Sequence, residues 1–170
     1  GRVELGENTP DGRPWSPGTI IVSHDPKRLA KDFGALTTLG DDFYVQLKPD
    51  EQGSRKLSFL SDDMLGNSGM GSIVLNTING DFELAAGAKL QLSPGASLTV
   101  AGTEGSTRDI RIFGQIRTPG GRIGLSSSNG ALEIGAQGRL DASGQWLNTW
   151  REGPGSGAWA IDGGAISISV

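Results

Sequence analysis

The chain contains an internal repeat fifty residues long. Residues 71–90 (GSIVLNTINGDFELAAGAKL) align without a gap to residues 121–140 (GRIGLSSSNGALEIGAQGRL), and a further start, GAISISV, begins at Gly164. Because structural repeats that stack on their neighbours must share one geometry, an ungapped repeat of this length predicts a stacked architecture. The eight identical pairs are Gly71/Gly121, Ile73/Ile123, Leu75/Leu125, Asn79/Asn129, Gly80/Gly130, Glu83/Glu133, Ala86/Ala136 and Leu90/Leu140.

Apolar residues inside the repeat come in pairs that are two positions apart. Side chains two positions apart lie on the same face of a strand, so each pair predicts a very short strand with one buried face. Turn-forming residues separate many of the pairs, at 79–80 (NG), 93–95 (SPG) and 119–121 (PGG). The pairs are Ile73/Leu75, Phe82/Leu84, Leu90/Leu92, Leu98/Val100, Ile110/Ile112, Ile123/Leu125, Leu132/Ile134 and Ile166/Ile168.

Six such strands fill one repeat when a further one at Ile116 is counted. Three strands in each coil would give a coil of about 25 residues and two coils per repeat. We therefore predict an all-β chain folded as a right-handed parallel β-helix (β-solenoid), whose inward side chains stack at the strand spacing of about 4.8 Å. An antiparallel sandwich, in which strands recur every 8–12 residues or so, is the alternative.

The first seventy residues do not match the repeat. Strands are expected at residues 19–22, 43–47 and 56–60, and a short helix at residues 25–33, with Asp25 as its cap. We therefore divide the chain into residues 1–70, which form either irregular N-terminal coils or an insertion lobe, and residues 71–170, which form the β-helix repeats.

Three segments of the chain resemble the haemagglutinin-type repeats of filamentous haemagglutinin-like exoproteins. They are residues 90–100 (LQLSPGASLTV), 112–123 (IFGQIRTPGGRI) and 140–148 (LDASGQWLN), of which the last is the most specific. The resemblance covers residues 60–170 and none of residues 1–59.

This resemblance implies an interior β-helix segment of a large protein exported by two-partner secretion. Such a protein leaves a Gram-negative cell through an outer-membrane transporter and is secreted or held at the bacterial cell surface. There it mediates adhesion to a host or partner cell, through a receptor or a glycan. The implied role of this segment is therefore a structural shaft rather than an enzyme.

Composition and charge argue against several other kinds of protein and site. The net charge is −4 and Lys and Arg are scattered, so a nucleic-acid surface, which needs clustered basic residues, is not expected. No apolar run approaches the roughly 18 residues that a membrane span needs. Cys is absent, which excludes disulfides and thiolate metal sites. Residues 1–8 are polar and position 1 is not Met, so we expect an interior piece of a longer chain.

Few residues suggest catalysis or metal binding. His24 is the single histidine, and its neighbours Ser23 and Asp25 would point away from it on a strand, so a triad is not expected. Imidazole would also need a second suitable ligand, which the sequence does not offer. The pairs at residues 41–42 and 62–63 (both DD) could supply calcium oxygens, but adjacent aspartates more often cap turns in solvent. We expect no catalytic residue, no metal and no cofactor.

Three tryptophans are the candidate ligand-binding residues. Trp146, Trp150 and Trp159 lie around a glycine-rich loop at residues 152–158. Exposed indoles on the flank of a stack can contact sugar rings, whereas the alternative is that these side chains pack against the motif and the loop.

Two other functions remain open from the sequence. A β-helical carbohydrate-active enzyme, such as a polysaccharide lyase or hydrolase, should show charged residues converging from successive coils. The aligned repeats offer Glu83/Glu133 and Lys89/Arg139 at such positions. A self-associating fibre subunit is the third possibility, because the ends of a stack leave strand edges open.

Overall fold

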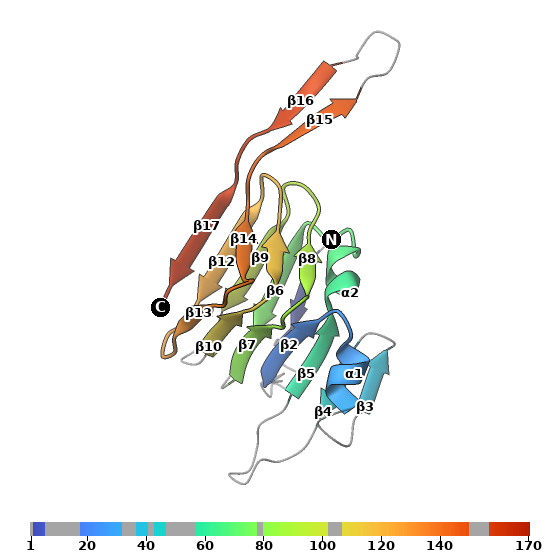
Figure 1. Cartoon of the computed structure of the whole chain (residues 1–170), viewed down its shortest axis with the longest axis vertical. Helices are drawn as coiled ribbons and strands as arrows, with labels where there is room; N and C mark the ends of the chain where they lie inside the picture. The colour runs from blue at the N-terminus through green and yellow to red at the C-terminus, as the bar shows by residue number, and fades with distance from the viewer. Residues whose placement is uncertain are drawn as a thin grey trace.

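Successive strands of the chain belong to different sheets, and most neighbouring strands within a sheet are parallel. The computed structural model describes residues 2–5, 18–31, 37–40, 43–46, 57–77, 80–101, 107–149 and 157–170. Figure 1 shows the strands stacked side by side with a hairpin projecting from one end. Sheet I has the order β1 (Arg2–Leu5), β6 (Ser72–Asn76), β9 (Ser97–Ala101), β12 (Arg122–Ser126) and β17 (Ala165–Ser169). Sheet III has the order β14 (Arg139–Asp141), β11 (Gln115–Arg117) and β8 (Lys89–Gln91).

Sheet II is the longest and includes strands from both halves of the chain. Its order is β13 (Leu132–Ile134), β10 (Thr107–Ile112), β7 (Gly80–Leu84), β2 (Thr19–Ser23), β5 (Leu57–Ser61), β4 (Phe43–Gln46) and β3 (Thr37–Gly40). The pairs β3–β4 and β4–β5 are antiparallel, and the other neighbours in this sheet are parallel. The chain is therefore rich in strands, as the sequence predicts, and its sheets are mostly parallel.

One pass through sheets I, II and III forms a coil. The three complete coils are β6–β7–β8, β9–β10–β11 and β12–β13–β14, and β17 begins the next pass. Residue 73 pairs with residue 98, and residue 98 pairs with residue 123, so equivalent positions in sheet I recur every 25 residues. The fifty-residue repeat of the sequence therefore corresponds to two coils of three strands each.

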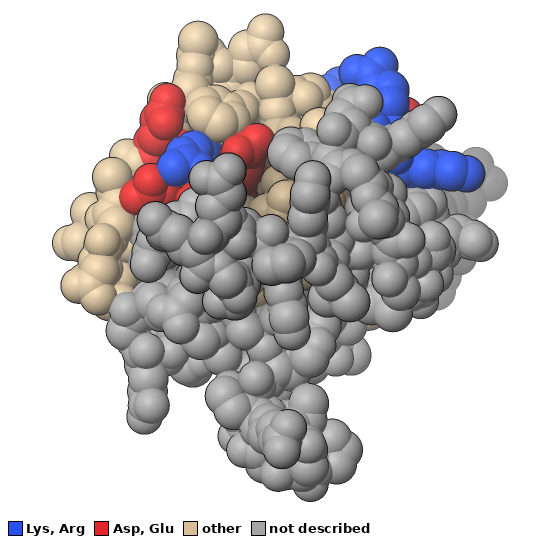
Figure 2. All heavy atoms as spheres, turned by 90° about the horizontal axis from the view of Figure 1, so that it is seen from below, with Lys and Arg blue, Asp and Glu red and all other residues tan. Residues whose placement is uncertain are grey.

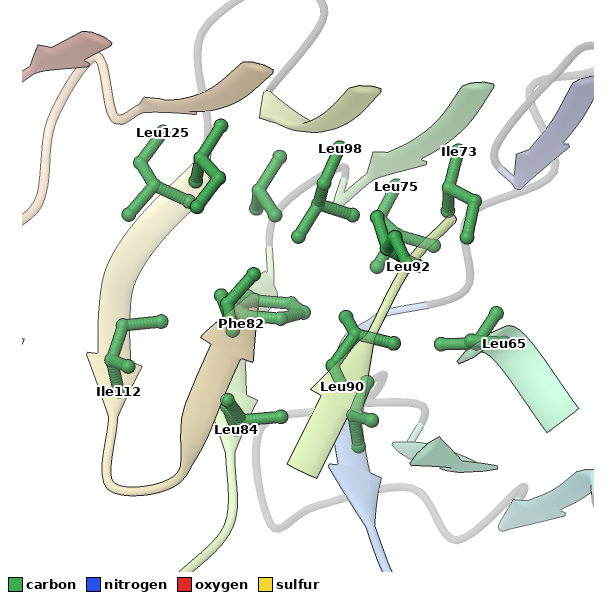
Figure 3. Packing of buried hydrophobic residues seen from close by; sticks show 14 of the residues in the cluster. Leu65, Ile73, Leu75, Phe82, Leu84, Leu90, Leu92, Leu98, Ile112 and Leu125 are labelled. Atoms are coloured by element: carbon green, nitrogen blue, oxygen red, sulfur yellow. The ribbon is translucent and has the colours of Figure 1, made fainter. Parts of the chain in front are cut away.

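The core consists of columns of inward side chains from successive coils. In sheet I, Ile73, Leu98 and Ile123 pair in register and are at most 1% exposed. Figure 3 shows side chains of this cluster pointing into a common interior. Full burial of one such side chain contributes about 1.5–3 kcal/mol to folding, so the columns account for much of the stability of the stack.

A glycine-rich corner connects sheet III to sheet I. The backbone N–H groups of Ser97, Arg122 and Ala165 donate to the carbonyl oxygens of Gly71, Ala96 and Gly121 at 2.9–3.0 Å, each one coil away. A Cβ added to Gly121 would overlap the Ala96 carbonyl oxygen, and one added to Gly164 would overlap the Gly121 carbonyl oxygen. Close backbone packing at this corner therefore explains why the repeat starts at Gly121 and Gly164 carry glycine.

The first seventy residues supply strands to the same sheets. β2 extends sheet II beyond β7, and β5 extends it beyond β2. The expected helix is present as α1 (Pro26–Lys31), which contacts β4 and β5, and residues 32–33 lie outside the described part. The strands expected at residues 19–22, 43–47 and 56–60 are present as β2, β4 and β5.

A second helix, which the sequence analysis did not predict, lies at the edge of sheet III. α2 (Asp62–Gly66) follows β5 directly and contacts β8. Leu65 on this helix is 2% exposed and belongs to the main core. The Asp62 carboxylate accepts a hydrogen bond from the Lys89 backbone N–H at 2.7 Å. The helix thus covers β8 and satisfies a donor on the edge of this strand.

A two-stranded hairpin is inserted between β14 and β17. It consists of β15 (Gln145–Thr149) and β16 (Gly157–Ile161), and it extends away from the stack (Figure 1). Residue 123 pairs with residue 166, which is 43 positions later and hence 18 more than one coil. The register of sheet I is therefore unchanged by the insertion.

Candidate functional site

The hairpin brings two of the three candidate tryptophans onto neighbouring strands. Trp146 on β15 pairs with Ala160 on β16, and Leu147 pairs with Trp159. The side chain of Trp146 is 74% exposed. Trp150 and the side chain of Trp159 lie outside the described part of the chain. An indole this exposed has room to stack on a flat ligand such as a sugar ring.

The base of the hairpin is fixed to the preceding coil. The Gly164 N–H donates to the Ala142 carbonyl at 2.7 Å, and the Gly120 N–H donates to the Ser143 carbonyl at 3.1 Å. Gly120 has a φ of 62°, and a Cβ on it would overlap the side chain of Ile161. Ile161 packs closely on the turn at Gly120, and this contact fixes the position at which β15 and β16 leave the stack.

The outer face of sheet II carries a cluster of charged residues. Arg111 pairs in register with Glu83 on one side and with Glu133 on the other. Its guanidinium also contacts the carboxylates of Asp81 at 3.2 Å and Asp109 at 2.6 Å. Partial burial raises the pKa of the Glu83 carboxyl, against the opposing effect of Arg111. On the face shown in Figure 2, acidic side chains surround a basic one.

This arrangement changes the interpretation of the aligned Glu83 and Glu133. They lie two coils apart, and Arg111 on the intervening coil separates them. Glu83 and Glu133 therefore flank Arg111 in register rather than forming a directly stacked pair.

A column of side-chain oxygens lies near the starts of β7, β10 and β13 in sheet II. The Asp81 N–H donates to the Thr19 hydroxyl, the Asp109 N–H to the Asp81 carboxylate, and the Ala131 N–H to the Asp109 carboxylate, at 3.1–3.2 Å. Each donor is one coil beyond its acceptor. Thr19, Asp81 and Asp109 therefore have a structural role in satisfying backbone donors between coils.

The outer face of sheet III carries mainly basic and amide side chains. Lys89, Gln115 and Arg139 pair in register across its three strands. Arg139 approaches the Asp141 carboxylate at 3.3 Å. Hydrogen bonds from the Ser143 hydroxyl and backbone N–H, aided by Arg139 and Arg117, hold the pKa of Asp141 below its usual value. Asp141 therefore stays ionised and links Arg139 on β14 to Ser143 in the turn that follows.

His24 lies beside two carboxylates that are distant from it in sequence. Its Nδ1 is 3.3 Å from Asp62 Oδ1 and 3.8 Å from Asp63 Oδ2. Asp62 is 1% exposed, whereas the side chains of His24 and Asp63 are 71% and 65% exposed. Their separation in sequence gave no indication of this proximity. The register of β2 and β5 brings them together, because it pairs Ser23 with Ser61, the residues that directly precede His24 and Asp62.

The neighbours of His24 in sequence do not form a triad with it. The Asp25 carboxylate accepts the Arg28 backbone N–H at 2.9 Å and so caps α1. The Ser23 hydroxyl is buried and has no hydrogen-bond partner in the described part of the chain. Residues 41–42, the other aspartate pair, lie outside the described residues.

Comparisons with protein-family models, with curated proteins and with solved structures found no match to this chain. Within the described residues, no helix is both long and apolar enough to span a membrane.

Proposed function

We propose that the chain is a segment of a right-handed parallel β-helix that serves as a structural shaft and presents the β15–β16 hairpin for binding. The in-register columns of inward side chains support this most directly. In such a stack, each coil of about 25 residues advances the structure by one strand spacing of about 4.8 Å. Repetition therefore extends the shaft without any change in cross-section.

The outer side of the last coil exposes apolar side chains. Ile134, Ile166 and Ile168 are 44–46% exposed, whereas their equivalents in the inner coils are buried. A further coil that pairs with β13, β14 and β17 would cover these side chains. The apolar face is thus suited to continued stacking.

The proposed setting is the surface of a Gram-negative cell, as part of a secreted adhesin-like exoprotein. It rests on the resemblance of residues 90–100, 112–123 and 140–148 to filamentous haemagglutinin-like repeats. The exposed Trp146 on a projecting hairpin adds a physical argument, because aromatic side chains supply large contact areas at recognition surfaces. We therefore assign contact with a cell-surface receptor or glycan to the hairpin.

Removal of the hairpin tests whether the hairpin carries the binding while the stack only supports it. Deletion of residues 145–161 leaves six residues (142–144 and 162–164) between β14 and β17, against five (92–96) between β8 and β9. The shortened corner should therefore close without disturbing the coils. Beads coated with the complete chain should adhere to epithelial or bacterial cells, and beads coated with the deleted chain should not.

Circular dichroism and thermal unfolding of both chains provide the control for folding. A Trp146→Ala variant should also lose adhesion while keeping the unfolding temperature of the original chain, because the indole is exposed. Equal adhesion of all three chains would exclude the hairpin as the binding element. Release of new reducing ends from a panel of polysaccharides would instead favour the carbohydrate-active enzyme.

A further inference from the structure

We propose that His24, Asp62 and Asp63 bind a divalent transition-metal ion, for which Zn²⁺ is the probe. One ligand atom from each residue lies within 4.8 Å of the others. In a tetrahedral zinc site with ligand distances of about 2.0–2.2 Å, neighbouring ligand atoms are about 3.3–3.6 Å apart. His24 Nδ1 is hydrogen-bonded to Asp62 Oδ1 at 3.3 Å and lies 3.8 Å from Asp63 Oδ2, so a small movement of the exposed side chains would give these spacings around an ion.

Two neighbouring strands of sheet II bring the three ligands together. β2 and β5 run parallel and pair Ser23 with Ser61, so His24 and Asp62 leave their strands at the same level. α2 begins at Asp62, and its Ser61 cap accepts the Met64 backbone N–H at 3.3 Å. The end of β2 and the start of α2 therefore lie close together.

The central ligand, Asp62, is held in place by the protein. Its Oδ2 accepts the Lys89 N–H at 2.7 Å, and its Oδ1 accepts the Asp63 N–H at 2.8 Å. A carboxylate oxygen has two lone pairs, so Oδ1 can accept this hydrogen bond and still bind an ion. His24 and Asp63 are exposed and can adjust by side-chain rotation, while water can complete the coordination.

The ligand set favours a particular class of ion. Imidazole nitrogen suits Zn²⁺ and related transition metals, whereas Ca²⁺ and Mg²⁺ prefer oxygen ligands throughout. Two carboxylates and a neutral imidazole also balance a divalent charge. Lys89 lines the same shallow depression as Asp62 and Asp63, and its ammonium group is a competing cation for their oxygens. The bound ion would link the end of β2 to α2, and so fasten the helix that covers β8.

Zinc titration of the complete chain tests the site. We expect one Zn²⁺ per chain in competition with a chromophoric chelator, and an increase in the unfolding temperature, because a ligand of the folded state stabilises it. The chain has one histidine, so a zinc-dependent shift of its single imidazole resonance in NMR reports on His24 alone.

Two ligand variants and one matched control separate this site from other acidic groups. His24→Gln and Asp63→Asn change exposed side chains and should weaken zinc binding by roughly tenfold or more while leaving the fold intact. Glu133→Gln removes an equivalent exposed negative charge from sheet II and should bind zinc as the original chain does. Absence of zinc binding, or binding that His24→Gln leaves unchanged, would overturn the assignment.

Discussion

Single positions in this chain are constrained chiefly by contacts between successive coils. Gly121 illustrates this, because its Cα faces the Ala96 carbonyl oxygen and the Thr118 hydroxyl. The Thr118 hydroxyl itself donates to the Ala96 carbonyl at 2.7 Å, so neither neighbour can move without loss of a buried hydrogen bond. A side chain as small as a methyl group therefore has no place here.

Gly121→Ala should lower the free energy of unfolding by about 1–3 kcal/mol, the usual cost of overpacking a close-packed site. Chemical denaturation measures this directly. Gly124→Ala, on the β12 strand that follows Gly121, is the control, because its new Cβ would meet Thr99 at an ordinary 3.8 Å. For Gly124→Ala we expect the free energy of unfolding to rise by up to about 1 kcal/mol, since glycine within a strand is less favourable than alanine. Equal losses in both variants would contradict the role of the corner.

The residues at the proposed metal site show what sequence alone could not provide. His24 and Asp62 are 38 positions apart, and the sequence contains no local motif that joins them. Their proximity depends on β5 pairing with β2 in parallel, a contact that lies outside the repeat. Trp146, by contrast, could be proposed as a candidate from the sequence, because it lies with two other tryptophans around a glycine-rich loop.

At the scale of elements, apolar residues two positions apart predicted the strands from β6 to β10, together with β12, β13 and β17, and Ile116 alone marked β11. α2 was missed because its five residues (DDMLG) are too few to show a helical period. The hairpin was missed because residues 152–158 suggested a loop, whereas β16 begins at Gly157. α2 precedes the repeat and the hairpin interrupts it, so periodicity carries no information about either element.

The stability of α2 should depend on its cap. Ser61→Ala removes the side-chain acceptor of the Met64 N–H and should cost about 1 kcal/mol. Because α2 covers β8, we also expect faster hydrogen exchange at the Lys89 amide, which donates to Asp62 at the start of the helix. Ser72→Ala, on β6, provides a control that leaves the helix intact. Unchanged exchange at Lys89 in Ser61→Ala would indicate that α2 stays docked without its cap.

At the scale of the whole molecule, burial is uneven along the stack. Ile123 is 1% exposed because coils lie on both sides of it, whereas Ile166, its partner in register, is 44% exposed. An isoleucine in this column therefore contributes more to the stability of the fold in an inner coil than in the last coil.

Alanine substitution at these two positions measures the difference. Ile123→Ala should cost about 2–5 kcal/mol, because it leaves a cavity between coils. Ile166→Ala should cost clearly less, because solvent already reaches the side chain. Thermal or chemical unfolding of both variants provides the comparison. Similar losses would mean that Ile166 is covered in solution, for example by a second copy of the chain.

The hairpin's point of attachment has a wider consequence for how such a chain can diversify. Eighteen additional residues are inserted at the corner between sheet III and sheet I, and the pairing of residues 123 and 166 stays intact. The entropic cost of a longer excursion rises only slowly with its length, by about 0.6 kcal/mol for each doubling. This corner can therefore act as a grafting site: unrelated peptide segments could be exchanged there, and new specificities acquired, while the supporting framework keeps its sequence.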